Sequence, residues 1–154
     1  MDDALLKTLP LVKCAAQEVL ITEGQPLEGI YFLESGEVEV LKGTMLIAEI
    51  FEPGAVFGEM SYLLHVPPTA TVRALTACTF RRVAQPAEFF RLHPEVTLYV
   101  SEILARRLDA LNRYLVDIKK QFADRADHLG IIDEVIDSLM HKHPRALPRR
   151  EAGD

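Results

Sequence analysis

Glycine and proline residues divide the stretch from Gln17 to Val83 into short pieces rich in β-branched and aromatic side chains. The pieces EVLI, GIYFLES, EVEVLK, MLIAEIF, ATVRAL and CTFRRV are four to seven residues long. Short strands separated by such turn signals are typical of a compact antiparallel barrel or a double-sheet roll. We therefore expect a mainly β fold with flanking helices, built as a jelly-roll-like β-roll, also described as a double-stranded β-helix.

One hairpin of this roll is predicted from LKGTML, in which Gly43 supplies the positive φ that a tight turn requires. Before it, Glu37 and Glu39 alternate with Val38 and Val40, which is the pattern of a strand with one buried and one solvated face. We expect both carboxylates on the solvated face.

After Gln85-Pro86 the apolar pattern changes from a strand period to a helix period. Pro94 suits the first position of a helix, and little interrupts the run from Glu95 to about Ala123. The expected organisation is an N-terminal helical segment over 1–16, the β-roll over 17–93, a long helix over 94–123, a short helix over 124–143 and a disordered tail over 144–154.

The long helix carries apolar residues that step by alternating fours and threes, as in a heptad seam. The seam residues are Leu104, Leu108, Leu111, Leu115, Ile118 and Phe122. Two interpretations remain open, a helix packed against its own roll and a helix that pairs with a second copy. A seam this narrow and regular favours the second, so we expect a homodimer.

Composition excludes several classes of function. A net charge of −6 gives no general attraction to nucleic acids or anionic membranes. Cys14 and Cys78 are far apart and form no CxxC pair, so we expect no metal site and no disulfide framework, only two buried thiols. The sequence shows no nucleophile–base pair, HExxH motif or phosphate-binding loop, so we expect no enzymatic activity and no required cofactor.

The N-terminal stretch MDDALLKTLP lacks the basic and apolar regions of a signal peptide. The apolar runs are shorter than the ~18 residues that a membrane-spanning helix needs. We therefore expect a cytoplasmic protein that does not contact a membrane.

Several pieces, taken in order, resemble the cyclic nucleotide-binding domain family. They are EVLITEGQPLEGIYFLESGEVEV, EPGAVFGEMSYLL, TATVRA and LARRL, which extend over roughly residues 19–115. More narrowly, it resembles the effector domain of bacterial catabolite-activator-type (Crp/Fnr) regulators. The resemblance implies a β-roll followed by a long dimerisation helix, with a cyclic nucleotide such as cAMP or cGMP as ligand.

The resemblance also implies a phosphate and ribose pocket made of Gly58, Glu59, Met60, Ser61, Pro68, Thr69 and Ala70. In the family, the glycine allows close approach of the backbone, the following amide groups face the cyclic phosphate, and the carboxylate accepts the ribose 2′-hydroxyl. On the long helix, Leu111 and Asn112 fall where the family contacts the base across the dimer.

Pro68 departs from the family pattern, because an arginine is expected at that position, just before the small hydroxyl residue Thr69. Proline removes the guanidinium and the backbone N–H. A charge-assisted hydrogen bond contributes roughly 1.5–3 kcal/mol, so its loss weakens affinity about 10- to 150-fold. Arg73 and His65 are the nearby cations. We expect Arg73 to be a surface or ion-pairing residue and His65 to be solvated, and a substitute phosphate contact from either is the less favoured alternative.

A DNA-binding role is not expected. Regulators of this kind carry a helix-turn-helix after the long helix, and the residues after Asp124 supply one clear helix, DHLGIIDEVIDSLM, but no recognition helix. We therefore expect a stand-alone regulatory sensor or adaptor with weak or altered ligand recognition and another protein as its downstream target. Ordinary cAMP or cGMP binding and a ligand-free protein-interaction module are the alternatives.

Overall fold

The computed structural model describes residues 3–121 and 134–138. The chain forms two compact units, residues 1–102 and residues 103–154. The first contains all the strands described below and the beginning of the long helix. Residues 134–138, in the second unit, are helical.

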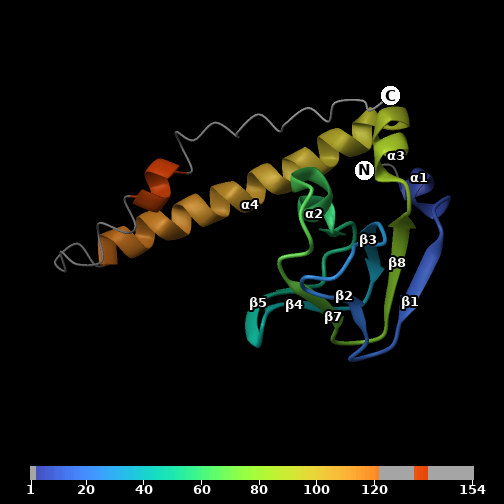
Figure 1. Ribbon diagram of the computed structural model, residues 1–154, viewed down its shortest axis with the longest axis horizontal. Helices are drawn as coiled ribbons and strands as arrows, with labels where there is room; N and C mark the ends of the chain where they lie inside the picture. Colours follow the sequence, from blue (N-terminus) through green and yellow to red (C-terminus); the bar gives the residue numbers. More distant parts are fainter. Residues whose placement is uncertain (1–2, 122–133, 139–154) are drawn as a thin grey trace, which may run out of the picture. The chain divides into compact units, whose positions relative to one another are not determined.

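In the part of the chain that the structure describes, eight strands form two four-stranded antiparallel sheets (Figure 1). The first has the order β1-β8-β3-β6 and the second the order β2-β7-β4-β5. The strands are β1 (Leu11–Cys14), β2 (Val19–Ile21), β3 (Ile30–Ser35), β4 (Val38–Lys42), β5 (Met45–Ile50), β6 (Val56–Phe57), β7 (Thr71–Ala74) and β8 (Cys78–Val83). Consecutive strands alternate between the sheets at several points, so the chain forms the expected β-roll, and the predicted fold class is confirmed.

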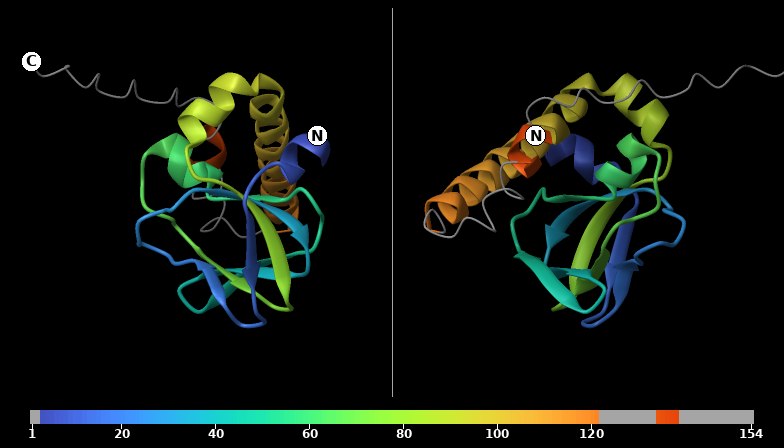
Figure 2. Two further views of the ribbon diagram at one scale, coloured as in Figure 1. Left: turned by 90° about the vertical axis from the view of Figure 1, so that its right-hand side faces the viewer. Right: turned by 60° about the vertical axis from the view of Figure 1, so that its left-hand side comes forward.

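Within residues 3–121, four helices accompany the strands: α1 (Asp3–Lys7), α2 (Glu59–Leu64), α3 (Pro86–Leu92) and α4 (Pro94–Gln121). Figure 2 shows α1, α2 and α3 at one end of the roll, where β8 leads into α3. Pro94 is the first residue of α4, as predicted, since a proline at that position loses no intrahelical hydrogen bond.

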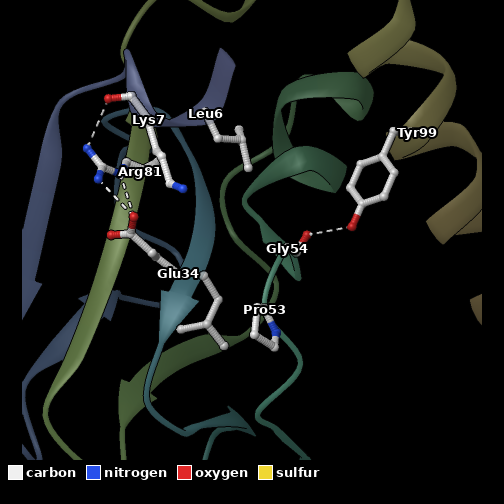
Figure 3. Close-up of a pocket in the computed structure, with 8 residues that line it drawn as sticks. Leu6, Lys7, Glu34, Pro53, Gly54, Arg81 and Tyr99 are labelled. Atoms are coloured by element: carbon white, nitrogen blue, oxygen red, sulfur yellow. Dashed lines mark hydrogen bonds and ion pairs between the residues drawn. The ribbon is translucent and has the colours of Figure 1, made fainter. Parts of the chain in front are cut away.

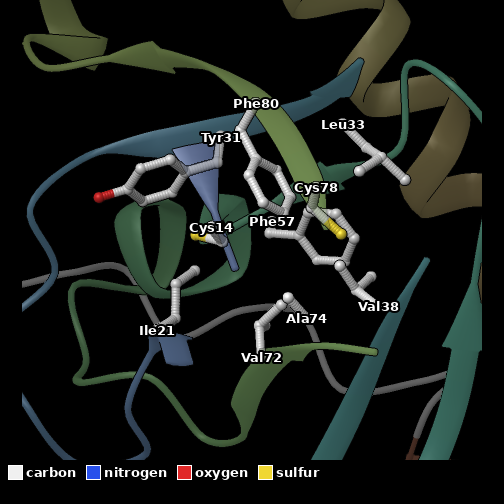
Figure 4. Close-up of a cluster of buried hydrophobic side chains, with 10 residues drawn as sticks. All are labelled: Cys14, Ile21, Tyr31, Leu33, Val38, Phe57, Val72, Ala74, Cys78 and Phe80. Carbon is white, nitrogen blue, oxygen red and sulfur yellow. The ribbon is translucent and has the colours of Figure 1, made fainter. Parts of the chain in front are cut away.

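The core of the roll lies between the two sheets (Figure 4). Phe57 and Phe80 meet edge to face, with their ring centroids 6.3 Å apart. The two thiols belong to this core, because Cys14 of β1 and Cys78 of β8 lie directly opposite each other in the strand register and both are buried. The other buried members are Ile21, Tyr31, Leu33, Val38, Val72 and Ala74.

The predicted hairpin joins β4 and β5 through Gly43 and Thr44, with Lys42 opposite Met45 in the register. Gly43 has a φ of +55°, in the left-handed region that favours glycine.

Two expectations need correction. The segment 1–16 was expected to be helical, but α1 ends at Lys7 and β1 follows at Leu11–Cys14, where it gains its hydrogen bonds by pairing with β8. Glu39 was expected on a solvated face but is only 8% exposed. Its burial is possible because Arg73 of the neighbouring strand β7 pairs with its carboxylate.

The seam residues from Leu104 to Ile118 all lie on α4, where Leu108 and Leu111 are exposed. Phe122, the tail over 144–154 and most of the predicted helix over 124–143 lie outside the described residues. Within the described ranges, no helix is both long and apolar enough to cross a bilayer.

Candidate cyclic nucleotide site

Gly58 joins β6 to α2 in a conformation that favours glycine. Its φ is +88°, and it is the residue that precedes the first turn of α2. A Cβ placed on it would lie 3.0 Å from the carbonyl oxygen of Gly29 and 3.1 Å from a methyl group of Leu27. A larger residue would therefore strain the backbone and require these neighbours to shift by a few tenths of an ångström.

The two sides of α2 differ in burial. Glu59 is 2% exposed and Ser61 is 8% exposed, whereas Met60, Leu63 and Leu64 face solvent. A nearly fully buried carboxylate is rare in proteins and needs hydrogen-bonding partners. Glu59 is thus a buried carboxylate at the start of α2, directly after Gly58.

A loop over residues 65–70 connects α2 to β7 and carries the second half of the predicted site. His65 ends α2 in the left-handed region, and its N–H bonds back to the last turn. Pro68 is buried, Thr69 is exposed and Ala70 is half-buried. The carbonyl oxygen of Pro68 accepts a hydrogen bond of 2.8 Å from the N–H of Gly24, which fixes the loop to the turn after β2.

A group of polar contacts, which we call the loop clamp, joins this loop to the β4–β5 hairpin and to the turn after β2. The Lys42 ammonium donates to the carbonyl oxygen of Thr69 at 2.7 Å and lies 3.5 Å from a carboxylate oxygen of Glu23. The other carboxylate oxygen of Glu23 accepts a hydrogen bond from the Gly43 N–H at 2.8 Å. The backbone N–H of Glu23 donates to the Thr71 hydroxyl at 3.0 Å.

The electrostatics of the clamp favour the ionised form of Glu23. The hydrogen bond from the Gly43 backbone, followed by the charge of Lys42, lowers the pKa of the Glu23 carboxyl below its ordinary value. Sequence reasoning missed both residues of this ion pair. In the sequence, Glu23 and Lys42 each stand directly before a turn glycine. That position does not show that the two turns lie close together in the fold.

The nearby cation Arg73 is engaged elsewhere. Its Nε donates to Glu39 Oε1 at 2.5 Å, in agreement with the expectation of a surface or ion-pairing residue. Neighbouring residues Val72 and Ala74 on β7 point into the core, so Arg73 projects from the opposite face of the sheet.

Two pockets lie near the roll's helical end. One, of about 400 Å³, is lined by Pro26, Leu27, Glu28, Gly29, Ser61, Tyr62, His65, Val66, Pro67, Ala84 and Pro86. It touches α2 and its loop but is not lined by Gly58, Glu59, Pro68 or Thr69.

The other pocket, of about 180 Å³, is drawn in Figure 3. On one side Arg81 binds Glu34 through Nε at 3.2 Å and Nη2 at 2.8 Å, and on the other Tyr99 donates its hydroxyl to the Gly54 carbonyl at 3.1 Å. Arg81 also donates to the Leu9 carbonyl at 3.1 Å, so these groups attach the N-terminal segment and the first turns of α4 to the roll.

Leu111 and Asn112, the predicted base contacts, lie on α4 in the second compact unit. Leu111 is exposed and Asn112 is half-buried. Their contact with a ligand remains a prediction.

The sequence from residue 11 to residue 92 matches the cyclic nucleotide-binding domain family. The matched region begins at β1 and ends at the last residue of α3, so it contains the whole roll and every predicted residue of the phosphate segment. The chain belongs to this family.

The matching region occurs in relatives that have different activities. The chain is 33% identical over 88 residues to a cAMP-dependent protein kinase regulatory subunit of Yarrowia lipolytica, covering 52% of this chain and 23% of that protein. It is 36% identical over 116 residues to Glutaminase 2 of Bradyrhizobium diazoefficiens, covering 71% of this chain and 18% of that protein. The chain therefore spans about a fifth of the length of these relatives.

Among solved structures, the catabolite activator protein of Thermus thermophilus is similar, with a TM-score of 0.65 and 22% identity over 76% of this chain and 58% of that one. This likeness shows that the fold is the one that catabolite-activator effector domains have. Within the described residues, no group of three or more histidine, cysteine or acidic side chains is arranged to hold a metal ion.

Proposed function

We propose that this cyclic nucleotide-binding domain is a regulatory, non-catalytic sensor whose ligand recognition is altered by Pro68. The observation that carries the proposal is the asymmetry of the phosphate segment. Its first half, Gly58 and the buried Glu59, agrees with the family pattern. Its second half has a buried proline in place of the expected arginine.

The expected consequence is a weak site for cyclic AMP or cyclic GMP. Backbone donors after Gly58 and the exposed Thr69 supply neutral hydrogen bonds, each of which contributes about 0.5–1.5 kcal/mol, against roughly 1.5–3 kcal/mol for a charge-assisted one. A ligand held mainly by neutral donors binds more weakly but keeps the ribose contact to Glu59.

Titration calorimetry with cyclic AMP and cyclic GMP tests this proposal, with the Pro68→Arg variant beside the unaltered chain. We expect weak binding by the unaltered chain and binding about 10- to 150-fold tighter by the variant, from the restored charge-assisted contact. Equal affinities for both proteins would contradict altered recognition. Absence of heat from both at millimolar ligand would contradict cyclic nucleotide binding altogether.

A second candidate function is a protein-interaction module that needs no ligand. The observation in its favour is the edge strand β5, where Met45, Leu46 and Ile47 are 50–68% exposed and Phe51 just beyond the strand is 63% exposed. Contiguous exposed apolar side chains are typical of protein contact sites. The calorimetric result that removes the sensor proposal would favour this module.

We also propose that the seam of α4 pairs with the same helix of a second copy. The exposed Leu108 and Leu111 support this, since a second seam would bury them. In such a dimer Asn112 would be able to both donate to and accept from a purine edge. The downstream partner of the sensor would then respond to a shift between two arrangements of the long helix.

A further inference from the structure

We infer that Lys42 supplies the positive charge that faces the ligand phosphate in place of the arginine missing at Pro68. This inference rests on the proposed function and adds one residue to its site. The starting observation is the hydrogen bond of 2.7 Å from the Lys42 ammonium to the carbonyl oxygen of Thr69, the residue after Pro68. The structure thus brings a cation from a distant hairpin to the loop position where the family pattern has lost one.

Two arginines of the roll, Arg73 and Arg81, are less suitable. Arg73 is committed to the buried carboxylate of Glu39 at 2.5 Å, and Arg81 is held by Glu34 at 2.8 Å. Removing either from its partner would leave a partly buried carboxylate without its counter-charge, which is costly. Lys42 differs because its side chain is 58% exposed and its ion pair with Glu23 is long, at 3.5 Å.

Lys42 also has the reach that the role requires. Its four-carbon stem is flexible and ends in a compact charge that carries three donors. A displacement of about one residue's length along a strand, roughly 3.3 Å, would carry the ammonium from the Thr69 carbonyl toward the amide and hydroxyl of the same residue. Thr69 holds the small hydroxyl position of the family pattern.

Glu23 acts against this role and thereby makes it testable. Its carboxylate stays ionised because the Gly43 N–H stabilises the charge, so it competes with a phosphate for the ammonium. Replacing Glu23 by glutamine removes the competing charge, while the amide oxygen can still accept from Gly43. The inference therefore predicts tighter ligand binding from the loss of an acidic residue near the site.

The decisive experiment measures cyclic AMP and adenosine affinities for the full chain and six variants by NMR titration at low salt; two of these are Pro68→Arg and Pro68→Arg combined with Lys42→Gln. Lys42→Gln should weaken cyclic AMP binding about tenfold, the lower end expected for a charge-assisted bond because the amine is more than half exposed. Lys42→Arg should keep most of the affinity, and Glu23→Gln should raise it about two- to threefold. Lys13→Gln, an exposed lysine on β1 in the other sheet, is the matched control and should change nothing.

Adenosine separates a charge effect from a packing effect, because it lacks the phosphate. We expect its affinity to be the same for the unaltered chain and for Lys42→Gln. If Lys42→Gln weakens adenosine as much as cyclic AMP, Lys42 only holds the hairpin in place and the inference is wrong.

The remaining outcomes are also decisive. If the unaltered chain binds cyclic AMP and Lys42→Gln binds it equally well, the inference fails while the proposed function stands. If the unaltered chain shows no binding and Pro68→Arg does bind, Lys42 does not replace the arginine, and the inference fails. If neither binds, the proposed function itself is wrong. Where both bind, the Lys42→Gln effect should be smaller in the Pro68→Arg background, because the two cations then serve one phosphate.

Discussion

Arg73 and Glu39 lie opposite each other on β7 and β4, and their side chains are joined by a hydrogen bond of 2.5 Å. The carboxylate is 8% exposed, so it depends on this partner more than a surface carboxylate would. The ion pair therefore stabilises the second sheet.

Arg73→Ala should lower the free energy of unfolding by about 1–3 kcal/mol, because it leaves Glu39 buried without its counter-charge. Arg73→Ala combined with Glu39→Leu should recover part of that loss, since no charge is then buried. Urea denaturation measures both. Cyclic AMP affinity should stay within about twofold in Arg73→Ala, and a much larger decrease would show that Arg73 contacts the ligand after all.

Glu59→Gln should weaken cyclic nucleotide binding about tenfold, because a charged acceptor for the ribose hydroxyl becomes a neutral one. The comparison ligand is 2′-deoxy cyclic AMP, which lacks that hydroxyl. Its affinity should be nearly the same for the unaltered chain and for the variant. Equal losses for both ligands would mean that Glu59 supports the loop and does not contact the ribose.

The seam of α4 gives a prediction about association. Leu108→Lys combined with Leu111→Lys should convert a dimer to a monomer, because two charges would be buried at the centre of the helix pair. Tyr114→Lys is the matched control, since Tyr114 is 63% exposed and lies outside the seam. Sedimentation equilibrium distinguishes the species, and a monomer before any substitution would refute the dimer proposal.

The buried Cys14 and Tyr31 predict a loss of stability at alkaline pH. Burial raises the pKa of both groups above their ordinary values, the nearby Glu18 adding to the effect at Cys14. The unfolded chain then loses these protons at a lower pH than the folded chain. Their contribution to stability is therefore complete below the ordinary thiol and phenol pKa values, about 8.5 and 10, and decreases as pH rises past them.

Urea denaturation at pH 7 and at alkaline pH measures this decrease. Tyr31→Phe and Cys14→Ala should each show a smaller decrease than the unaltered chain, because the titrating group is gone. A pH dependence unchanged by both substitutions would contradict the argument.

Two glycines with positive φ should respond differently to alanine. A Cβ on Gly36 would lie 2.6 Å from the Ala77 carbonyl oxygen and 2.6 Å from the Cys78 sulfur, whereas a Cβ on Gly43 would meet nothing within 4 Å. Gly43→Ala should therefore lower the free energy of unfolding by about 1–2 kcal/mol, because of the left-handed backbone alone. Gly36→Ala should lower the free energy of unfolding more than Gly43→Ala does, and should therefore lower the melting temperature further in a thermal scan. Equal decreases for the two variants would contradict the close contacts around Gly36.

The roll was predictable because its turn residues and strand composition repeat with a short period. Even so, β1 was missed, since LVKC has only four residues and owes its strand conformation to the register with β8, 64 to 70 positions away in the sequence. The burial of Glu39 was missed for a related reason, because its alternation with valines predicted a solvated face and its partner Arg73 comes from another strand.

The phosphate segment was predicted from Gly58 and Glu59, whose order along the chain carries the family pattern. The contact of Lys42 with Thr69 was not predicted. It joins residues 27 positions apart, in a hairpin and a loop that come together only in the complete fold. Local composition contains no information on which turns converge in space.

The pairing of β1 with β8 has a consequence for how such a domain is combined with others. Pro10, just before β1, accepts a hydrogen bond of 2.9 Å from the N–H of Arg82, one residue before the end of β8. The chain thus enters the roll before β1 and leaves it after β8 at neighbouring points. Because these two points are close together, the roll can be inserted into or fused to an unrelated protein without a large change in that protein's fold. That geometry accords with relatives in which the matching region is a small fraction of a much larger polypeptide.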